Sequence, residues 1–290
     1  MVQVAPGEGL LEIVDRFDDD TVDAETVRAE NGLETDELEP GQLLDVCVDN
    51  GLNDIDGATR TGRNTVIVDR AVRRQQEQLN TLFTGFGIRE LTVDGISGPV
   101  TRQRLCAFRL AVGLPVTLTD MEPGGEEEQK LFATATLTAP LDPVMLTDRW
   151  ALVDQTCQIM FVGAGTRLQF VFPASTGVAE YRTRDQHLSE VFKYDPAADN
   201  AGWHNSLTYP AAEDNPLNGN MYRPLYFDRG QAIHGANNVP RSPASHGCVR
   251  LRVVDMDALV HWLGLGGDTS VTYDEGRIDL VVTVQGRYPG

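Results

Sequence analysis

The chain has 290 residues, 41% of them hydrophobic and 23% charged, which is the composition of a globular protein with two or three domains. With 43 acidic and 24 basic residues the formal net charge is −19 at pH 7, so nucleic acid and anionic membranes are not expected as partners. No apolar run approaches the roughly 18 residues of a membrane-spanning helix, and no export signal follows Met1, so membrane insertion is not expected.

The first 50 residues predict a small βααβ module. Residues 2–4 and 43–48 are typical of short strands, and apolar residues recur at helical spacing over residues 10–17 and about 24–31. Three motifs resemble the LysM family: Gly7-Glu8-Gly9-Leu10, Glu30-Asn31-Gly32-Leu33 and Pro40-Gly41-Gln42-Leu43. The resemblance implies binding to the glycan of peptidoglycan, and the alternative is a spacer fold without a ligand. Residues 51–64 are polar and glycine-rich, so we expect a linker.

Residues 65–140 predict three helices, over about 66–86, 101–112 and 126–133. An apolar stripe along the first helix leaves Gln75 and Gln76 on its surface side, and Glu126–Glu128 is expected to form a solvated face of the third.

A glycine-rich motif lies between the first two of these helices. Val93-Asp94-Gly95 is followed by Gly98-Pro99 and Thr101, and this pattern resembles the three-helix peptidoglycan-binding domain. The resemblance implies a second module that binds the cell wall. Asp94 alone is far short of the six to eight oxygen ligands of a calcium site, so no metal is expected there.

The remaining residues, 148–290, predict a mostly-β domain. Five stretches indicate strands: residues 150–153, 158–162, 167–173, 270–273 and 278–284. Residues 253–263 predict an amphipathic helix. A long polar stretch over residues 195–220 is a candidate flap, with a surface loop as the alternative. The whole chain is therefore predicted to be a multidomain α+β protein.

Within this last domain, Cys248 has two histidines close to it in sequence. A thiol with a free pKa of about 8.5 needs a neighbouring base to supply thiolate at neutral pH, and imidazole is such a base. His246 lies two residues before Cys248 and His234 lies 14 before it, with turn-forming residues between them that predict a returning loop. Gly247 leaves the backbone amides uncrowded for an oxyanion, and Arg250 supplies a positive charge suited to a carboxylate.

Two segments, Ile233-His234-Gly235 and Ser245-His246-Gly247-Cys248-Val249-Arg250-Leu251, resemble the L,D-transpeptidase (YkuD) family. Its pattern is His-Gly, a loop, then Ser/Thr-His-Gly-Cys before an apolar residue and Arg or Asn. The resemblance implies that Cys248 is the nucleophile and His234 the general base. It implies that amides of Gly247 and Cys248 bind the oxyanion, and that Arg250 binds substrate or orders the site. His246 is a supporting residue of the motif.

The choice between the two histidines depends on local geometry. Residues two apart in an extended strand share a face, so His246 and Cys248 would lie together and either imidazole is a possible base. Gly235 favours His234, because its exposed carbonyl can accept the other ring N–H and fix the tautomer. We therefore predict that His234 is the base.

The resemblance also provides substrate-binding candidates. Besides Arg250 these are Ser245, Gly235, Tyr222 and Arg223, the last two because their strand borders the cleft in the family. Ser175-Thr176-Gly177 is similar to the Ser-Thr-Gly that precedes a Thr-Pro-x-Gly loop in the family. Residues 180–187 replace that loop here, so this edge of the groove is unassigned.

Two other interpretations of the motif remain. A structural cysteine beside satisfied histidines would need no chemistry. A zinc site would use the same residue types, but the C-x-x-C or H-x-x-x-H spacing of such sites is missing. We therefore expect no metal and no cofactor.

The other cysteines are Cys47, Cys106 and Cys157. If Cys248 is a free thiol, at most one disulfide can form among these three, and the sequence does not say which. Cys157 begins a predicted strand and has no histidine within ten residues, so we interpret it as a small core hydrophobe.

Together these resemblances imply an extracytoplasmic L,D-transpeptidase that cross-links peptidoglycan stems through a Cys248 thioester. One alternative is a carboxypeptidase or endopeptidase in which water attacks the same thioester. Another is a wall-binding protein without catalysis. The expected partners are the peptide stems and the glycan of the wall.

Overall fold

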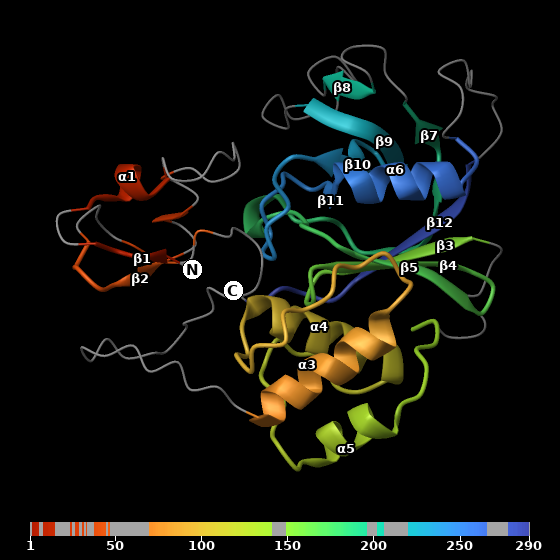
Figure 1. Cartoon of the computed structure of the whole chain (residues 1–290). Coiled ribbons are helices and arrows are strands. Elements are labelled where there is room, and N and C mark those ends of the chain that lie inside the picture. The colour runs from red at the N-terminus through yellow and green to blue at the C-terminus, as the bar shows by residue number, and fades with distance from the viewer. Residues whose placement is uncertain are drawn as a thin grey trace. The chain divides into compact units, whose positions relative to one another are not determined.

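The computed structural model describes residues 70–140, 149–195, 202–205, 220–265 and 278–289, together with parts of residues 2–46 (Figure 1). The chain divides into two compact units. The first unit takes residues 1–81, 90–105 and 119–134, and the second takes 82–89, 106–118 and 135–290.

The N-terminal segment forms a small sheet with one helix. Strand β1 (Val2–Gln3) pairs antiparallel with β2 (Leu43–Leu44), and α1 (Leu10–Val14) lies between them in sequence. A small apolar core consists of Val4, Leu10, Ile13, Val27, Leu33, Leu44 and Val46. Most of the expected second helix and the linker fall outside the described residues. The LysM-like assignment therefore remains a prediction.

Three helices follow, with bounds close to those expected. They are α3 (Arg70–Phe83), α4 (Pro99–Val112) and α5 (Glu126–Ala133). Helix α4 begins at Pro99, where the missing proline N–H costs no helical hydrogen bond. The peptidoglycan-binding assignment of these helices also remains a prediction.

Polar side chains fill part of the interior between these helices. Gln76 is 1% exposed; its Oε1 accepts from Gly95 N at 2.9 Å, and its Nε2 donates to Asp94 Oδ1 at 2.8 Å. Gln75 is equally buried and donates to Glu128 Oε1 at 2.8 Å. The expected surface positions of Gln75, Gln76 and Glu128 are therefore wrong. Buried turn amides need partners, and these side chains supply some of them.

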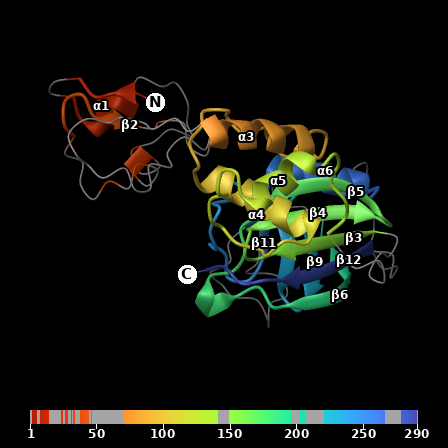
Figure 2. The same cartoon turned by 90° about the horizontal axis from the view of Figure 1, so that it is seen from below.

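Two five-stranded sheets make up the strand-rich part of the second unit. The first has the order β5 (Arg167–Pro173), β4 (Ile159–Ala164), β3 (Trp150–Asp154), β12 (Ile278–Gln285) and β6 (Gln186–Val191) (Figure 2). The second has the order β11 (Val249–Arg252), β10 (Gln231–Ala236), β9 (Asn220–Asp228) and β7 (Lys193–Tyr194), and β8 (Trp203–Asn205) also pairs with β9. The strand expected at residues 270–273 lies outside the described residues.

Helix α6 (Val253–Trp262) packs against β9, β10 and β11. Its apolar residues share one core with both sheets, and this core includes Val153, Met160, Leu225, Ile233, Val249, Leu251, Met256, Leu259 and Val282. One face of the β9–β10–β11 sheet is therefore covered by α6 and the core. A functional site on this sheet would have to lie on the opposite face.

A disulfide joins Cys106 in α4 to Cys157 in the turn between β3 and β4. Both side chains are fully buried, and both residues belong to the second unit. The interpretation of Cys157 as an unpaired core hydrophobe is therefore wrong. The bridge also links two regions expected to be separate domains, residues 65–140 and 148–290. Cys47 lies outside the described residues.

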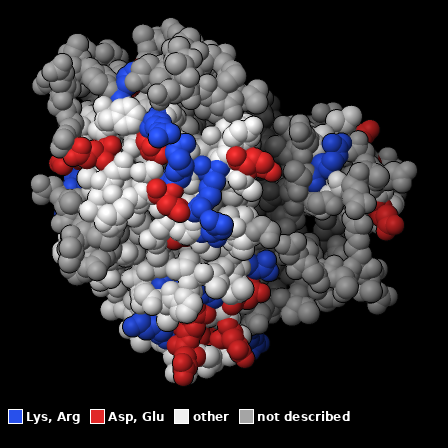
Figure 3. Space-filling model, turned by 180° about the vertical axis from the view of Figure 1, so that it is seen from behind, with Lys and Arg blue, Asp and Glu red and all other residues white. Residues whose placement is uncertain are grey.

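Acidic and basic side chains lie interspersed on the face shown in Figure 3. Pairs such as Arg102–Asp120 at 2.8 Å and Arg252–Asp255 at 2.6 Å neutralise part of the acidic charge locally. None of the helices in the described part of the chain has the length and apolarity that a membrane crossing requires.

The disulfide predicts a measurable loss of stability when it is removed. Changing Cys106→Ser and Cys157→Ser together should lower the free energy of unfolding by about 2–4 kcal/mol, because the bridge restricts the unfolded chain. Urea denaturation followed by tryptophan fluorescence measures the change. Reductant should shift the wild-type midpoint in the same direction and leave the double variant unaffected. Equal urea midpoints for the wild type and the double variant, both measured without reductant, would contradict the presence of the bridge.

Candidate active site

Parallel pairing of β10 and β11 brings the two halves of the motif together. Ile233 pairs with Val249, and His234 pairs with Arg250. Side chains alternate along a strand, so His234, Arg250 and Cys248 share one face while Ile233 and Val249 point into the core. The loop expected between the two segments thus returns the chain beside His234.

His234 is held as a neutral imidazole. Its side chain is buried, and Nδ1 lies 2.9 Å from the Gly235 carbonyl oxygen. A carbonyl only accepts, so Nδ1 carries the proton and Nε2 is the acceptor. Burial, aided by the Arg250 charge and opposed by the Gly235 hydrogen bond, lowers the pKa of His234 to about 4. The ring is therefore uncharged at neutral pH, the state in which it can take a proton.

Cys248 is the described cysteine that is not in a disulfide, and it is 3% exposed. Its Sγ lies 3.8 Å from Met221 Sδ and 3.8 Å from the Gly230 carbonyl oxygen. Met221 and Tyr226 belong to the same apolar cluster as this thiol. The nucleophile candidate thus lies against an apolar wall from β9.

Arg250 is the cation nearest to this thiol along the strand. Burial lowers the pKa of the Arg250 guanidinium, and the charge of Cys248 opposes that shift. The two groups therefore interact electrostatically. A positive charge at this position favours thiolate over thiol at Cys248.

Ser245 orders the turn that carries the nucleophile. Its Oγ donates to the Cys248 carbonyl oxygen at 2.6 Å and accepts from Gly247 N at 3.1 Å. The Gly247 amide is therefore already engaged, and an oxyanion would have to share or displace that hydrogen bond. Ser245 shapes this backbone through contacts within the turn.

Gly247 is required by the geometry of the turn. Its φ is +115°, and a Cβ here would clash with Gln231 Nε2. Any side chain would therefore be strained at this φ and would displace the Gln231 amide from its place beside Gly247.

The extended backbone that would place His246 on the same face as Cys248 is not formed. Residues 246 and 247 form a bend, so the alternation of an extended strand does not apply and gives no reason for His246 to share a face with Cys248. The imidazole packs against Tyr181 with ring centroids 4.8 Å apart, and its buried Nδ1 has no hydrogen-bond partner among the described residues.

Tyr222, Arg223 and Gly235 make contacts on the core side of the sheet. Tyr222 pairs with Gly235, and a Cβ on Gly235 would lie 2.9 Å from the Tyr222 ring. The Arg223 guanidinium lies 5.3 Å from the Tyr222 ring centroid and 3.5 Å from Asp257 on α6. The structure thus brings Tyr222 and Arg223 together with each other but not with Cys248.

The segment that the sequence left unassigned packs against the motif. Its 3₁₀ turn η2 (Ala179–Tyr181) supplies the Tyr181 ring, and the Arg182 carbonyl oxygen accepts from Gln231 Nε2 at 3.1 Å. Gln231 Oε1 accepts from Arg184 N at 3.0 Å. The polar Gln231 at the start of β10 was the available signal for this contact.

Most of the expected flap over residues 195–220 lies outside the described residues. Within the described part, His204 Nδ1 lies 3.2 Å from Asp195 Oδ2. His204 pairs with Met221, so it is placed on the same sheet face as Met221 and Cys248. The described residues contain no group of three or more His, Cys, Asp or Glu side chains that could hold a metal ion.

Comparison with known proteins identifies the strand-rich part of the chain. Residues 148–273 match the family model of the YkuD L,D-transpeptidase catalytic domain, which confirms the resemblance for this region. The match begins at residue 148 and leaves the two N-terminal modules as predictions. A search among curated proteins found no match.

Three solved structures illustrate the similarity. An L,D-transpeptidase from Xylanimonas cellulosilytica is 27% identical, with 74% of this chain and 92% of that chain covered and a TM-score of 0.43. One from Stackebrandtia nassauensis is 18% identical, with 77% and 94% covered and a TM-score of 0.42. L,D-transpeptidase 3 from Mycobacterium tuberculosis is 16% identical, with 48% and 61% covered and a TM-score of 0.36.

The two histidines predict different effects on the thiol. His234→Gln should move the pH midpoint of Cys248 alkylation towards the free value of about 8.5, because the proton acceptor is lost. His246→Gln should keep a lower midpoint, because its ring packs on Tyr181 and its Nδ1 has no described partner. The rate of iodoacetamide labelling against pH measures both. A raised midpoint in His246→Gln alone would reverse the assignment.

Proposed function

We propose that this protein is an L,D-transpeptidase that cross-links peptidoglycan through a thioester on Cys248. The observation that carries the proposal is the pair of Cys248 and a neutral, buried His234 on one face of the β10–β11 sheet. The family match over residues 148–273 supports the same reaction class.

The first half-reaction is acyl transfer to sulfur. His234 Nε2 takes the thiol proton, and the Cys248 thiolate attacks the carbonyl carbon between a diamino acid and D-alanine in a peptide stem. The tetrahedral oxyanion collapses to the thioester, and His234 returns its proton to the amine of the departing D-alanine. Arg250 favours the thiolate that begins this step.

The second half-reaction restores the thiol. The side-chain amine of another stem attacks the thioester carbonyl, and His234 takes a proton from the nitrogen. The new amide forms as sulfur leaves, and His234 returns the proton to the Cys248 sulfur. Uncharged His234 is suited to both steps, because it accepts a proton in the first and again in the second.

The disulfide supports an extracytoplasmic location. Bridges such as Cys106–Cys157 form and persist in oxidising compartments, and the wall that the enzyme would cross-link lies outside the cytoplasmic membrane. The proposed glycan- and peptidoglycan-binding modules would hold the enzyme on its polymer and raise the effective substrate concentration.

The acyl-enzyme provides the direct test. Wild-type protein incubated with a disaccharide-tetrapeptide should gain the mass of the stem without its terminal D-alanine, because Cys248 retains the acyl group. Peptide mapping should place this adduct on Cys248 in the wild type and in Cys106→Ser/Cys157→Ser, and Cys248→Ala should gain no mass. An adduct on Cys248→Ala would contradict the proposal. The released product distinguishes transfer from hydrolysis. Transfer gives two coupled stems, whereas hydrolysis gives a single stem that has gained water.

The N-terminal module predicts a second, separable effect. Deleting residues 1–64 leaves Cys106 and every residue of the second unit in place, so acylation of Cys248 should be unchanged. Binding to insoluble peptidoglycan should weaken, because the proposed glycan-binding module is gone. Co-sedimentation with sacculi measures the change. Undiminished binding would identify residues 1–64 as a spacer.

A further inference from the structure

Gln158 is a buried polar residue that the proposed chemistry does not use. It follows the bridged Cys157 in the turn between β3 and β4, is 0% exposed, and has a φ of +50°. A left-handed backbone is disfavoured for residues other than glycine and persists where surrounding contacts hold it. The Cys106–Cys157 disulfide holds it from one side, and a hydrogen bond from Ala174 N to its carbonyl oxygen at 2.9 Å holds it from another.

The side-chain amide of Gln158 holds Thr176 at two points. Gln158 Nε2 donates to Thr176 Oγ1 at 2.8 Å, and Gln158 Oε1 accepts from Thr176 N at 2.8 Å. Nε2 also donates to the Gln155 carbonyl oxygen at 2.7 Å, which fixes the amide within its own turn. Thr176 is fully buried and therefore has little freedom beside this amide.

Thr176 in turn holds the segment that carries the nucleophile. Its carbonyl oxygen accepts from Ala244 N at 2.9 Å and from Ser245 N at 3.0 Å. Ser245 Oγ then bonds both the Cys248 carbonyl oxygen and Gly247 N. Two buried residues, Thr176 and Ser245, thus connect the Gln158 amide to the backbone of Cys248. Water cannot readily replace hydrogen bonds in so buried a series.

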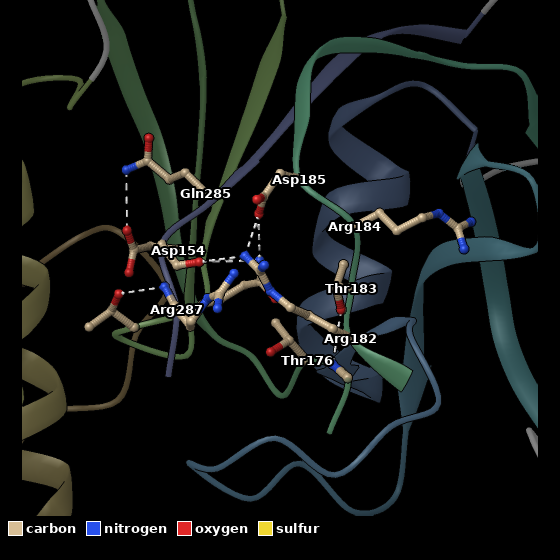
Figure 4. Close-up of polar contacts among 12 residues, drawn as sticks. Asp154, Thr176, Arg182, Thr183, Arg184, Asp185, Gln285 and Arg287 are labelled. Atoms are coloured by element: carbon tan, nitrogen blue, oxygen red, sulfur yellow. Dashed lines mark hydrogen bonds and ion pairs between the residues drawn. The ribbon is translucent and has the colours of Figure 1, made fainter. Parts of the chain in front are cut away.

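A second set of contacts leaves the same turn and reaches the neighbouring segment. Gln155 Nε2 donates to Asp185 Oδ1 at 3.1 Å, and Arg182 donates to the same oxygen at 2.6 Å. Thr183 Oγ1 accepts from Gly177 N at 2.9 Å. Figure 4 shows Arg182 and Asp185 pointing towards each other, with Thr176 and Thr183 close by. The turn therefore contacts both Thr176 and the segment that contains Asp185.

We propose that Gln158 is a positioning residue for Cys248, acting through Thr176 and Ser245. The inference rests on the proposed role of Cys248 as the nucleophile. Acyl transfer requires sulfur at attack distance from the carbonyl carbon, and misplacement by about 1 Å can cost roughly 100-fold in rate. The Gln158 amide sets the backbone of the turn that determines this placement.

A purely structural role is the competing explanation, and the chain offers a matched control. Gln76 is also buried, and its side-chain Nε2 and Oε1 both make hydrogen bonds. Its partners, however, lie in the first unit. A general loss of buried hydrogen bonds would affect Gln158→Met and Gln76→Met alike. A positioning role would affect Cys248 in Gln158→Met alone.

The experiment measures the rate of Cys248 acylation by disaccharide-tetrapeptide and the pH midpoint of its alkylation by iodoacetamide. Gln158→Met should reduce the acylation rate by about 10- to 100-fold at saturating donor and shift the midpoint. Gln76→Met should leave the rate within about twofold, because the hydrogen-bond partners that it would lose, Asp94 and Gly95, belong to the first unit. Urea midpoints of the two variants show whether their losses of stability match.

Variants at Thr176 keep the test decisive if Gln158→Met does not fold. Thr176→Val preserves shape but removes the acceptor for Gln158 Nε2, so its acylation rate should fall, and Thr176→Ser should restore it. Wild-type rates in both Gln158→Met and Thr176→Val would overturn the proposal, as would an equal fall in Gln76→Met. Failure of wild-type Cys248 to be acylated would instead count against the proposed function.

Discussion

The parallel register of β10 and β11 is the constraint on which the rest of the site depends. It places His234 beside Arg250, two residues past Cys248, so three polar groups share a face while Ile233 and Val249 enter the core. Moving β11 by one residue would turn the thiol into the core and an apolar side chain towards the site. Core packing against α6 therefore also maintains the alignment of the chemical groups.

Burial is the main cause of the pKa shifts of His234 and Arg250. Removed from water, His234 is uncharged well below neutral pH, and its one carbonyl partner decides which nitrogen accepts a proton. The partly buried Arg250 guanidinium interacts electrostatically with Cys248, and partial burial makes such an interaction stronger than at the surface. In the proposed reaction these two properties would make His234 a neutral base and would favour the Cys248 thiolate.

The approach of the two motif segments could be predicted from the sequence, because it depends on local spacing. The positions of His234 and Cys248 on either side of a turn-rich loop predicted that the two would approach. The buried hydrogen bonds of Gln76 and Gln158 and the pairing of Cys157 could not be predicted in this way. Whether a glutamine faces solvent depends on which backbone amides reach it from distant segments, and whether a cysteine is paired depends on a partner 51 residues away. Local periodicity contains neither fact.

The burial of the disulfide has a consequence for the redox chemistry of the second unit. A thiolate is the species that attacks disulfides, so a nucleophilic cysteine and a bridge in one unit risk exchanging partners. Cys106 and Cys157 are each 0% exposed, and their sulfurs are enclosed by packed side chains that an attacking thiolate would have to displace. Burial of the bridge therefore allows the second unit to contain a disulfide and the free thiol of Cys248 together, and the proposed nucleophile would not be lost to exchange with the bridge.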